Sequence, residues 1–246
     1  MRKVTLHGIM SEDRDHLRSN ESDDNMRYNL WGRFVLKKLA YPVVWVLLKL
    51  GVSANTVTGF GFLVACSGCL LIATGSNAHM VVGVALVNVW ALLDYADGQV
   101  ARWNRTSGNY GRFFDNVCDI SVAGLLFLCL GIGVNHSTGE YIYLILGAWC
   151  SICYLLTMVI SYSFERLISP QLVGFVSSMR VRWLPANLVQ TVGFNLQNVT
   201  GLIMPAILIG VVFGFLPGVL VLWSVIGTGG VCFMAYSMLK RAGSAR

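Results

Sequence analysis

Charged residues are scarce in this chain of 246 residues, where they make up 12% of the sequence against 55% hydrophobic residues. Asp and Glu together number only twelve, and six of them lie before residue 25. So low a charge content is typical of a protein embedded in a membrane. Acids that remain within apolar surroundings are costly there, so they are candidate functional residues.

The spacing of the cysteine and histidine residues indicates no disulfide, redox or metal site. The pairs Cys66/Cys69 and Cys150/Cys153 are spaced i, i+3 inside apolar segments, which favours small buried hydrophobic residues over redox or metal roles. The four histidines lie in expected tail or loop positions. The seven cysteines therefore predict no disulfide framework, and no Cys/His zinc site is apparent.

We expect no cleaved signal peptide among the first 25 residues, because they are polar and charged. We expect residues 1–25 to form a flexible polar cytoplasmic tail. Residues 26–50 interleave aromatic and aliphatic with basic residues, which predicts an amphipathic helix in the membrane interface, kinked or broken at Pro42. The alternative is that 41–50 extends the first membrane span.

Long apolar segments are what the chain has in abundance. A helix needs about 20 largely apolar residues to cross a bilayer. Six segments satisfy this, at roughly 53–75, 79–101, 112–134, 141–164, 188–213 and 217–239. The predicted fold is therefore all-α and integral to the membrane, with six transmembrane helices forming one domain over 51–246.

Lys and Arg are distributed unevenly between the connections. Nine of the eighteen precede residue 50, and the others flank the second-to-third connection, lie in the fourth-to-fifth connection or end the chain. The connections near 76–78, 135–140 and 214–216 have none. The positive-inside rule then predicts cytoplasmic termini. We interpret the net charge of +6 as a topology and lipid-surface signal, with no nucleic-acid partner.

Four acids fall within 26 residues of this apolar chain. Asp94 and Asp97 share one face of a predicted helix, and Asp115 and Asp119 share a face of the next. If the two helices are antiparallel neighbours, the four carboxylates converge and would repel one another unless neutralised. Hard divalent cations such as Mg²⁺ or Mn²⁺ take oxygen ligands, and two such ions about 4 Å apart are a common arrangement for phosphoryl displacement.

The pattern D-x2-D-G-x2-A-R-x8-G-x3-D-x3-D resembles the signature of the CDP-alcohol phosphotransferases, integral-membrane enzymes of phospholipid headgroup synthesis. All eight defining positions match: Asp94, Asp97, Gly98, Ala101, Arg102, Gly111, Asp115 and Asp119. A weaker likeness lies at the start of the first span, where Asn55 and Thr58 match and Ala54 replaces the usual proline.

The resemblance implies roles for these residues. Asp94, Asp97 and Asp115 would hold two Mg²⁺ or Mn²⁺ ions, and Asp119 would be shared between a metal and the acceptor hydroxyl as general base. The CDP site would be formed by Asn55, Thr58, Gly98, Ala101, Arg102 and Gly111. The family also implies a homodimer. The positive-inside rule, by contrast, is what predicts that the motif opens toward the cytoplasm, where a nucleotide donor would be.

The resemblance implies a reaction in which a substituted phosphate is transferred from a CDP-linked donor to an alcohol, with release of CMP. The enzyme would work in contact with membrane lipid. We expect CDP-diacylglycerol as donor and a polar acceptor such as glycerol phosphate or inositol phosphate. Arg166, Arg180 and Arg182, in the fourth-to-fifth connection, are candidate ligands of the acceptor phosphate, although plain positive-inside anchoring would explain them equally.

Two alternatives remain open. The same motif would serve an enzyme that transfers choline or ethanolamine phosphate from its CDP derivative to diacylglycerol. A cation or proton transporter would also use intramembrane acids, but it predicts repeated halves, and the chain has no second copy of the acid motif.

Overall fold

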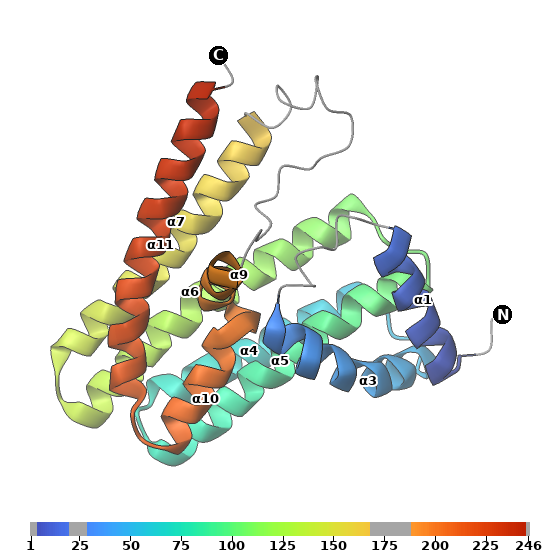
Figure 1. Cartoon of the computed structure of the whole chain (residues 1–246). Coiled ribbons are helices and arrows are strands. Elements are labelled where there is room, and N and C mark those ends of the chain that lie inside the picture. Colours follow the sequence, from blue (N-terminus) through green and yellow to red (C-terminus); the bar gives the residue numbers. More distant parts are fainter. Residues whose placement is uncertain (1–3, 20–28, 168–187, 245–246) are drawn as a thin grey trace.

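The computed structural model describes residues 4–19, 29–167 and 188–244, and throughout these ranges the regular elements are helical (Figure 1). In chain order they are α1 (Leu6–Ser19), the π-helix η2 (Gly32–Leu36), α3 (Lys37–Lys49), α4 (Ala54–Ala73), α5 (Asn77–Trp103), α6 (Asn109–Thr138), α7 (Tyr141–Leu167), α9 (Leu188–Gln197), the π-helix η3 (Val199–Ile203), α10 (Met204–Val212) and α11 (Leu216–Ser244).

Membrane-spanning helices form most of the structure, as predicted. Within the described ranges α4, α5, α6, α7 and α11 are each long and apolar enough to cross a bilayer. The fifth predicted span, 188–213, is divided into α9 and the segment formed by η3 and α10, which meet at a bend of 79°. The prediction of an all-α membrane protein is confirmed: five of the six predicted spans are continuous helices, and the fifth is broken.

The break in that span has a local cause. Asn198 adopts an extended conformation and its side chain accepts a hydrogen bond from the Thr200 amide at 3.1 Å, so it caps η3 and ends α9. Gly201 follows with non-helical φ and ψ of −87° and −117°. A short polar side chain that competes with the backbone interrupts a helix in this way.

The N-terminal region differs from the expected flexible tail. Residues 6–19 form α1, and its Ile9 side chain is buried in a cluster with Ala40 and Val44 of α3 and Val100 of α5. A buried apolar side chain stabilises a docked helix that the surrounding polar residues did not suggest. The remainder of the predicted tail, 1–3 and 20–25, lies outside the described residues.

The juxtamembrane segment is helical and separate from the first span. Helix α3 continues through Pro42, so the expected break does not occur there. It ends at Lys49, and the chain turns at Gly51, whose φ of +69° favours glycine, before α4 begins at Ala54. The alternative that 41–50 extends the first span is therefore wrong.

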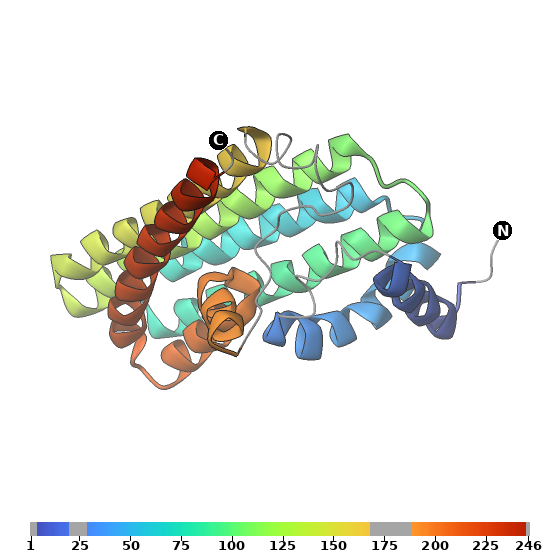
Figure 2. The ribbon, with the colours of Figure 1, turned by 45° about the horizontal axis from the view of Figure 1, so that its top comes forward.

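The spans are arranged with alternating direction, as Figures 1 and 2 show from two sides. The α4–α5, α6–α7 and α10–α11 connections, which lack Lys and Arg, lie at one end. The α5–α6 connection and α1 lie toward the opposite end. Helix α4 packs against both α5 and α6, while α7 packs against α6 and α11.

Close packing of α4 on α5 depends on Gly68 and Gly83. A Cβ atom added at Gly83 would lie 2.5 Å from the Gly68 carbonyl oxygen and 2.8 Å from a side-chain carbon of Ile72. Added at Gly68, it would lie 2.7 Å from the Gly83 carbonyl oxygen. Small residues of this kind let two membrane helices approach at backbone distance.

We therefore expect Gly83→Ala to destabilise the protein by about 1–3 kcal/mol, because the added methyl group overpacks the crossing. Thermal unfolding in detergent measures the effect as a lowered midpoint. Gly229→Ala in α11 is the matched control, since nothing lies within 4 Å of the position of its Cβ. Equal midpoints for the two variants would contradict the importance of the α4–α5 crossing.

Candidate metal centre

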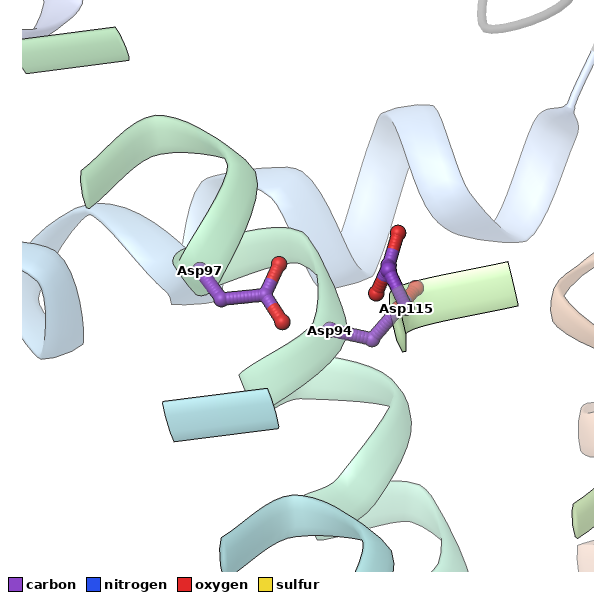
Figure 3. Close-up of side chains that lie close together, drawn as sticks. All are labelled: Asp94, Asp97 and Asp115. Atoms are coloured by element: carbon purple, nitrogen blue, oxygen red, sulfur yellow. The ribbon is translucent and has the colours of Figure 1, made fainter. Parts of the chain in front are cut away.

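Three of the four predicted acids converge at the end of the bundle that carries the α5–α6 connection. Asp94 and Asp97 extend from α5 toward Asp115 of α6 (Figure 3). One carboxylate oxygen from each lies within 4.8 Å of the other two. The sequence argument assumed that α5 and α6 are neighbouring helices. In the structure α4 packs against both of them and joins them.

The short connection after α5 brings the two halves of the motif together. The Thr106 amide donates to the Ala101 carbonyl at 2.9 Å, and Arg105 adopts a left-handed conformation with φ of 55°. Helix α6 then begins after Gly108, whose conformation is extended. The chain thus reverses direction within a few residues, so the acids on the last turns of α5 face those on the first turns of α6.

Burial and hydrogen bonding support a cation at this position. Asp97 is only 5% exposed, and its Oδ2 accepts a hydrogen bond from the Thr58 hydroxyl of α4. Among the described residues, Oδ1 of Asp115 and Oδ1 of Asp119 are buried and have no hydrogen-bond partner. An unsatisfied buried acceptor costs about 1–3 kcal/mol, and more if it is charged. These oxygens therefore fit a hard divalent cation, which would satisfy and neutralise them.

Asp119 occupies a different position from the other three acids. It lies outside the group whose oxygens lie within 4.8 Å of one another, one helical turn after Asp115 on α6. Its carboxyl is next to that of Asp94. This placement leaves it at the edge of the centre, with one buried oxygen available to a ligand. Its predicted double role as metal ligand and base stays a prediction.

Asn55, Thr58 and Gly111 of the predicted nucleotide-binding set surround the acids. Thr58 contacts Asp97 directly. The Oδ1 atom of Asn55 lies 3.3 Å from the position of a Cβ added at Gly111, so these two positions face each other across α4 and α6. Asn55 is exposed, which leaves its amide accessible to a ligand.

The other members of that set lie on α5. Gly98 directly follows Asp97, and the guanidinium of Arg102 lies over it, with Nη1 at 3.3 Å from the position of a Cβ added there. Ala101 precedes Arg102 and accepts the hydrogen bond that ends the helix. The six residues are thus gathered around the acids, while their contact with a nucleotide stays a prediction.

Sequence reasoning missed Asp13 of α1. This carboxylate is 5% exposed, lies 2.6 Å from Lys37 Nζ, and accepts a hydrogen bond of 2.9 Å from the Tyr41 hydroxyl. Its other oxygen lies 3.4 Å from Nη2 of Arg102, a motif residue. The signal in the sequence was weak: Ile9 and Asp13 are spaced i, i+4 and share a helix face.

A buried polar network next to the acids was also missed. Asn29 Nδ2 donates to the Tyr95 hydroxyl at 3.1 Å and to Thr200 Oγ1 at 2.7 Å. Asn195, which is fully buried, accepts from the Leu30 amide at 2.8 Å. This hydrogen bond ties the segment just before the break in the fifth span to the juxtamembrane segment.

The candidate acceptor arginines cannot be placed. Arg180 and Arg182 lie outside the described residues. Arg166 belongs to the last turn of α7, and its side chain is outside the described part of the structure. Their binding of an acceptor phosphate stays a prediction.

Comparison with known proteins decides the family. A model of the CDP-alcohol phosphatidyltransferase family matches residues 51–228, which include the whole acid motif and the helices that hold it. The chain belongs to this family. The five apolar helices and the broken span agree with an integral-membrane protein of that family.

Two relatives are informative. The phosphatidylinositol phosphate synthase of Corynebacterium glutamicum is 30% identical over 135 residues, which cover 54% of this chain and 59% of that protein. The match therefore spans less than two thirds of the relative's length. The crystal structure of Mycobacterium tuberculosis phosphatidylinositol phosphate synthase with CDP-DAG bound superposes with a TM-score of 0.56 at 18% identity. The superposition covers 86% of this chain and 93% of the Mycobacterium tuberculosis chain, so the two proteins share a fold.

Proposed function

We propose that this protein transfers the phosphatidyl group of CDP-diacylglycerol to a hydroxyl of a phosphorylated, water-soluble alcohol and releases CMP. The observation that carries the proposal is the convergence of Asp94, Asp97 and Asp115 within a family motif matched at all eight positions. The names of the two relatives favour inositol phosphate over glycerol phosphate as acceptor.

The carboxylates have the arrangement that such a transfer needs. Asp94, Asp97 and Asp115 would hold Mg²⁺ or Mn²⁺, two ions in the full site, with Asp119 beside them. When bound, the cations would stabilise negative charge on the pyrophosphate and on the departing CMP. The Thr58 hydroxyl orients Asp97 by its hydrogen bond, so this ligand is held in one direction before substrate binds.

Asp119 is proposed as the general base. Its buried Oδ1 has no hydrogen-bond partner among the described residues, so it is available to an acceptor hydroxyl. In the proposed step the acceptor oxygen forms a bond to the phosphatidyl phosphorus as the bond from that phosphorus to the CMP oxygen breaks. The hydroxyl proton passes to Asp119, and the electron pair of the broken bond leaves with CMP.

The nucleotide would lie where the six motif-associated residues gather. Gly98 and Gly111 leave room for a ligand to approach the helix backbones. Arg102 offers a planar guanidinium suited to phosphate oxygens, and the exposed Asn55 amide faces Gly111 across the site. The acyl chains of the donor would remain between the apolar helices.

A release assay tests the proposal and separates it from its alternatives. The protein is incubated with Mg²⁺ or Mn²⁺, with CDP-diacylglycerol or CDP-choline, and with inositol phosphate, glycerol phosphate, free inositol or diacylglycerol. We expect CMP release only from CDP-diacylglycerol with a phosphorylated acceptor. Release from CDP-choline with diacylglycerol would instead support headgroup transfer. No release from any pair would leave the transporter alternative.

The protein is proposed to be a homodimer, as the family resemblance implies.

Both termini and the metal centre are proposed to face the cytoplasm, where a nucleotide-linked donor is made. Single cysteines introduced near 77, 137 and 215 into a cysteine-free variant should react with an impermeant thiol reagent on intact cells. Cysteines near 20, 107, 175 and 244 should react only after permeabilisation. Labelling near 107 from outside would invert the orientation and contradict the proposal.

A further inference from the structure

The N-terminal helix α1 brings a buried acid to the edge of the proposed nucleotide site. Asp13 uses Oδ2 for Lys37 Nζ at 2.6 Å and for the Tyr41 hydroxyl at 2.9 Å. Its Oδ1 is directed to Nη2 of Arg102 at 3.4 Å. A carboxylate that is only 5% exposed and contacts two cations is held in place by charge on both sides.

The two terminal nitrogens of the Arg102 guanidinium have different surroundings. Its Nη2 atom is directed toward Asp13, and its Nη1 atom lies over Gly98, 3.3 Å from the position of a Cβ added there. An arginine side chain has several rotatable bonds, and fixing it costs conformational entropy. A carboxylate bound to one nitrogen removes part of that freedom and leaves the other donors for a ligand.

Helix α1 is anchored next to this contact. Ile9 is buried with Ala40 and Val44 of α3. Gly8 packs against the indole of Trp103, the residue after Arg102, since a Cβ added at Gly8 would lie 3.2 Å from that ring. The docking of α1 on α3 and α5 therefore sets where Asp13 stands relative to Arg102.

We propose that Asp13 is a positioning residue for the donor nucleotide: it binds Nη2 of Arg102 and thereby presents Nη1 at Gly98 to the pyrophosphate. The inference rests on the proposed function, because it assigns Arg102 to the donor. It extends the nucleotide site to an element outside the matched family region, which begins at residue 51. Asp13 acts through Arg102 and has no contact with the acceptor in this proposal.

The test compares the KM for CDP-diacylglycerol, the KM for the acceptor and kcat in Asp13→Asn. We expect the donor KM to rise by about tenfold, in the range seen when a partner that orients a ligand-binding side chain is removed. The acceptor KM should change less than twofold. Titration of the Mg²⁺-loaded protein with CDP, followed by tryptophan fluorescence, should show the same loss of affinity.

Two further variants separate positioning from folding. Asp13→Asn leaves Lys37 buried without its carboxylate, so the double variant Asp13→Asn/Lys37→Met removes both charges and should recover the melting temperature while it keeps the donor defect. Tyr41→Phe is the matched control, because it removes a hydrogen bond to Asp13 and leaves the Arg102 contact in place. Its donor KM should stay within twofold of the wild type.

A coupling measurement completes the test. In an Arg102→Ala background, Asp13→Asn should weaken CDP binding no further, because the residue through which it acts is gone. Normal donor KM in Asp13→Asn, an equal defect in Tyr41→Phe, or a further loss in the Arg102→Ala background would each overturn the inference. If the wild type itself releases no CMP from CDP-diacylglycerol, the proposed function fails instead, and the two failures are distinguishable.

Discussion

Asparagine in place of Asp94, Asp97, Asp115 or Asp119 is expected to reduce CMP release by more than about 100-fold, the scale associated with loss of a group that stabilises transition-state charge. Three of these acids place oxygens within 4.8 Å of one another, so loss of any one leaves a cation poorly held. For Asp119 the expected loss also reflects the missing proton acceptor. EDTA should abolish CMP release by the wild type, and added Mg²⁺ or Mn²⁺ should restore it.

A stability measurement shows whether the loss reflects the cation. Mg²⁺ or Mn²⁺ should raise the melting temperature of the detergent-solubilised wild type, because a ligand that binds only the folded state stabilises it. The rise should be absent from the four Asp→Asn variants, which should still unfold cooperatively. Glu140→Gln is the control, since this exposed acid lies at the α6–α7 connection away from the centre. Near-normal turnover of Asp97→Asn or Asp115→Asn with either metal would refute the metal centre.

Alanine in place of Arg166, Arg180 or Arg182 has the second large expected effect, and it falls on the acceptor. A charge-assisted hydrogen bond contributes about 1.5–3 kcal/mol, or roughly ten- to a hundredfold in affinity. At the residue that binds the acceptor phosphate, the acceptor KM should rise by that factor and the donor KM should change little. Lysine should restore binding only partly, because it lacks the planar fork of arginine.

The same measurement on Lys49→Ala distinguishes phosphate binding from topology. Lys49 ends α3 on the basic side of the predicted topology and lies over the Trp45 ring at 3.7 Å, outside the proposed sites. Its removal should leave both KM values unchanged. If all three arginine variants also keep a normal acceptor KM, those arginines serve only to orient the protein in the membrane. An uncharged alcohol or diacylglycerol would then be the better acceptor.

The cluster of acids was predictable from the sequence because helical periodicity is local. Asp94 and Asp97 share a face of α5, and the short connection before α6 leaves little choice in where Asp115 lies. The spans were predictable for a similar reason, since a bilayer demands long apolar helices whatever their tertiary contacts. The family followed from the same residues, at fixed spacing.

Position within the site was less predictable. The sequence treats Asp115 and Asp119 alike, at i and i+4, but the structure groups Asp115 with both acids of α5, while the carboxyl of Asp119 is next to that of Asp94. How α5 and α6 are placed relative to each other depends on their contacts with α4, which packs against both. Those contacts connect residues distant in the chain, so no local pattern reveals them.

The sequence by itself therefore determined the membrane class, the number and approximate limits of the apolar segments, the acid motif and the family. Only the tertiary structure decided that residues 6–19 form a docked helix, that the fifth span is broken at Asn198, and that Asp13 meets Arg102. The docking of residues 6–19 depends on the burial of Ile9 against α3 and α5, and the break has a local cause at Asn198. The contact of Asp13 with Arg102 depends on a polar group that finds a partner far away in the chain. Such a group looks like a solvated surface residue in the sequence, and the burial that makes its pairing necessary exists only in the folded protein.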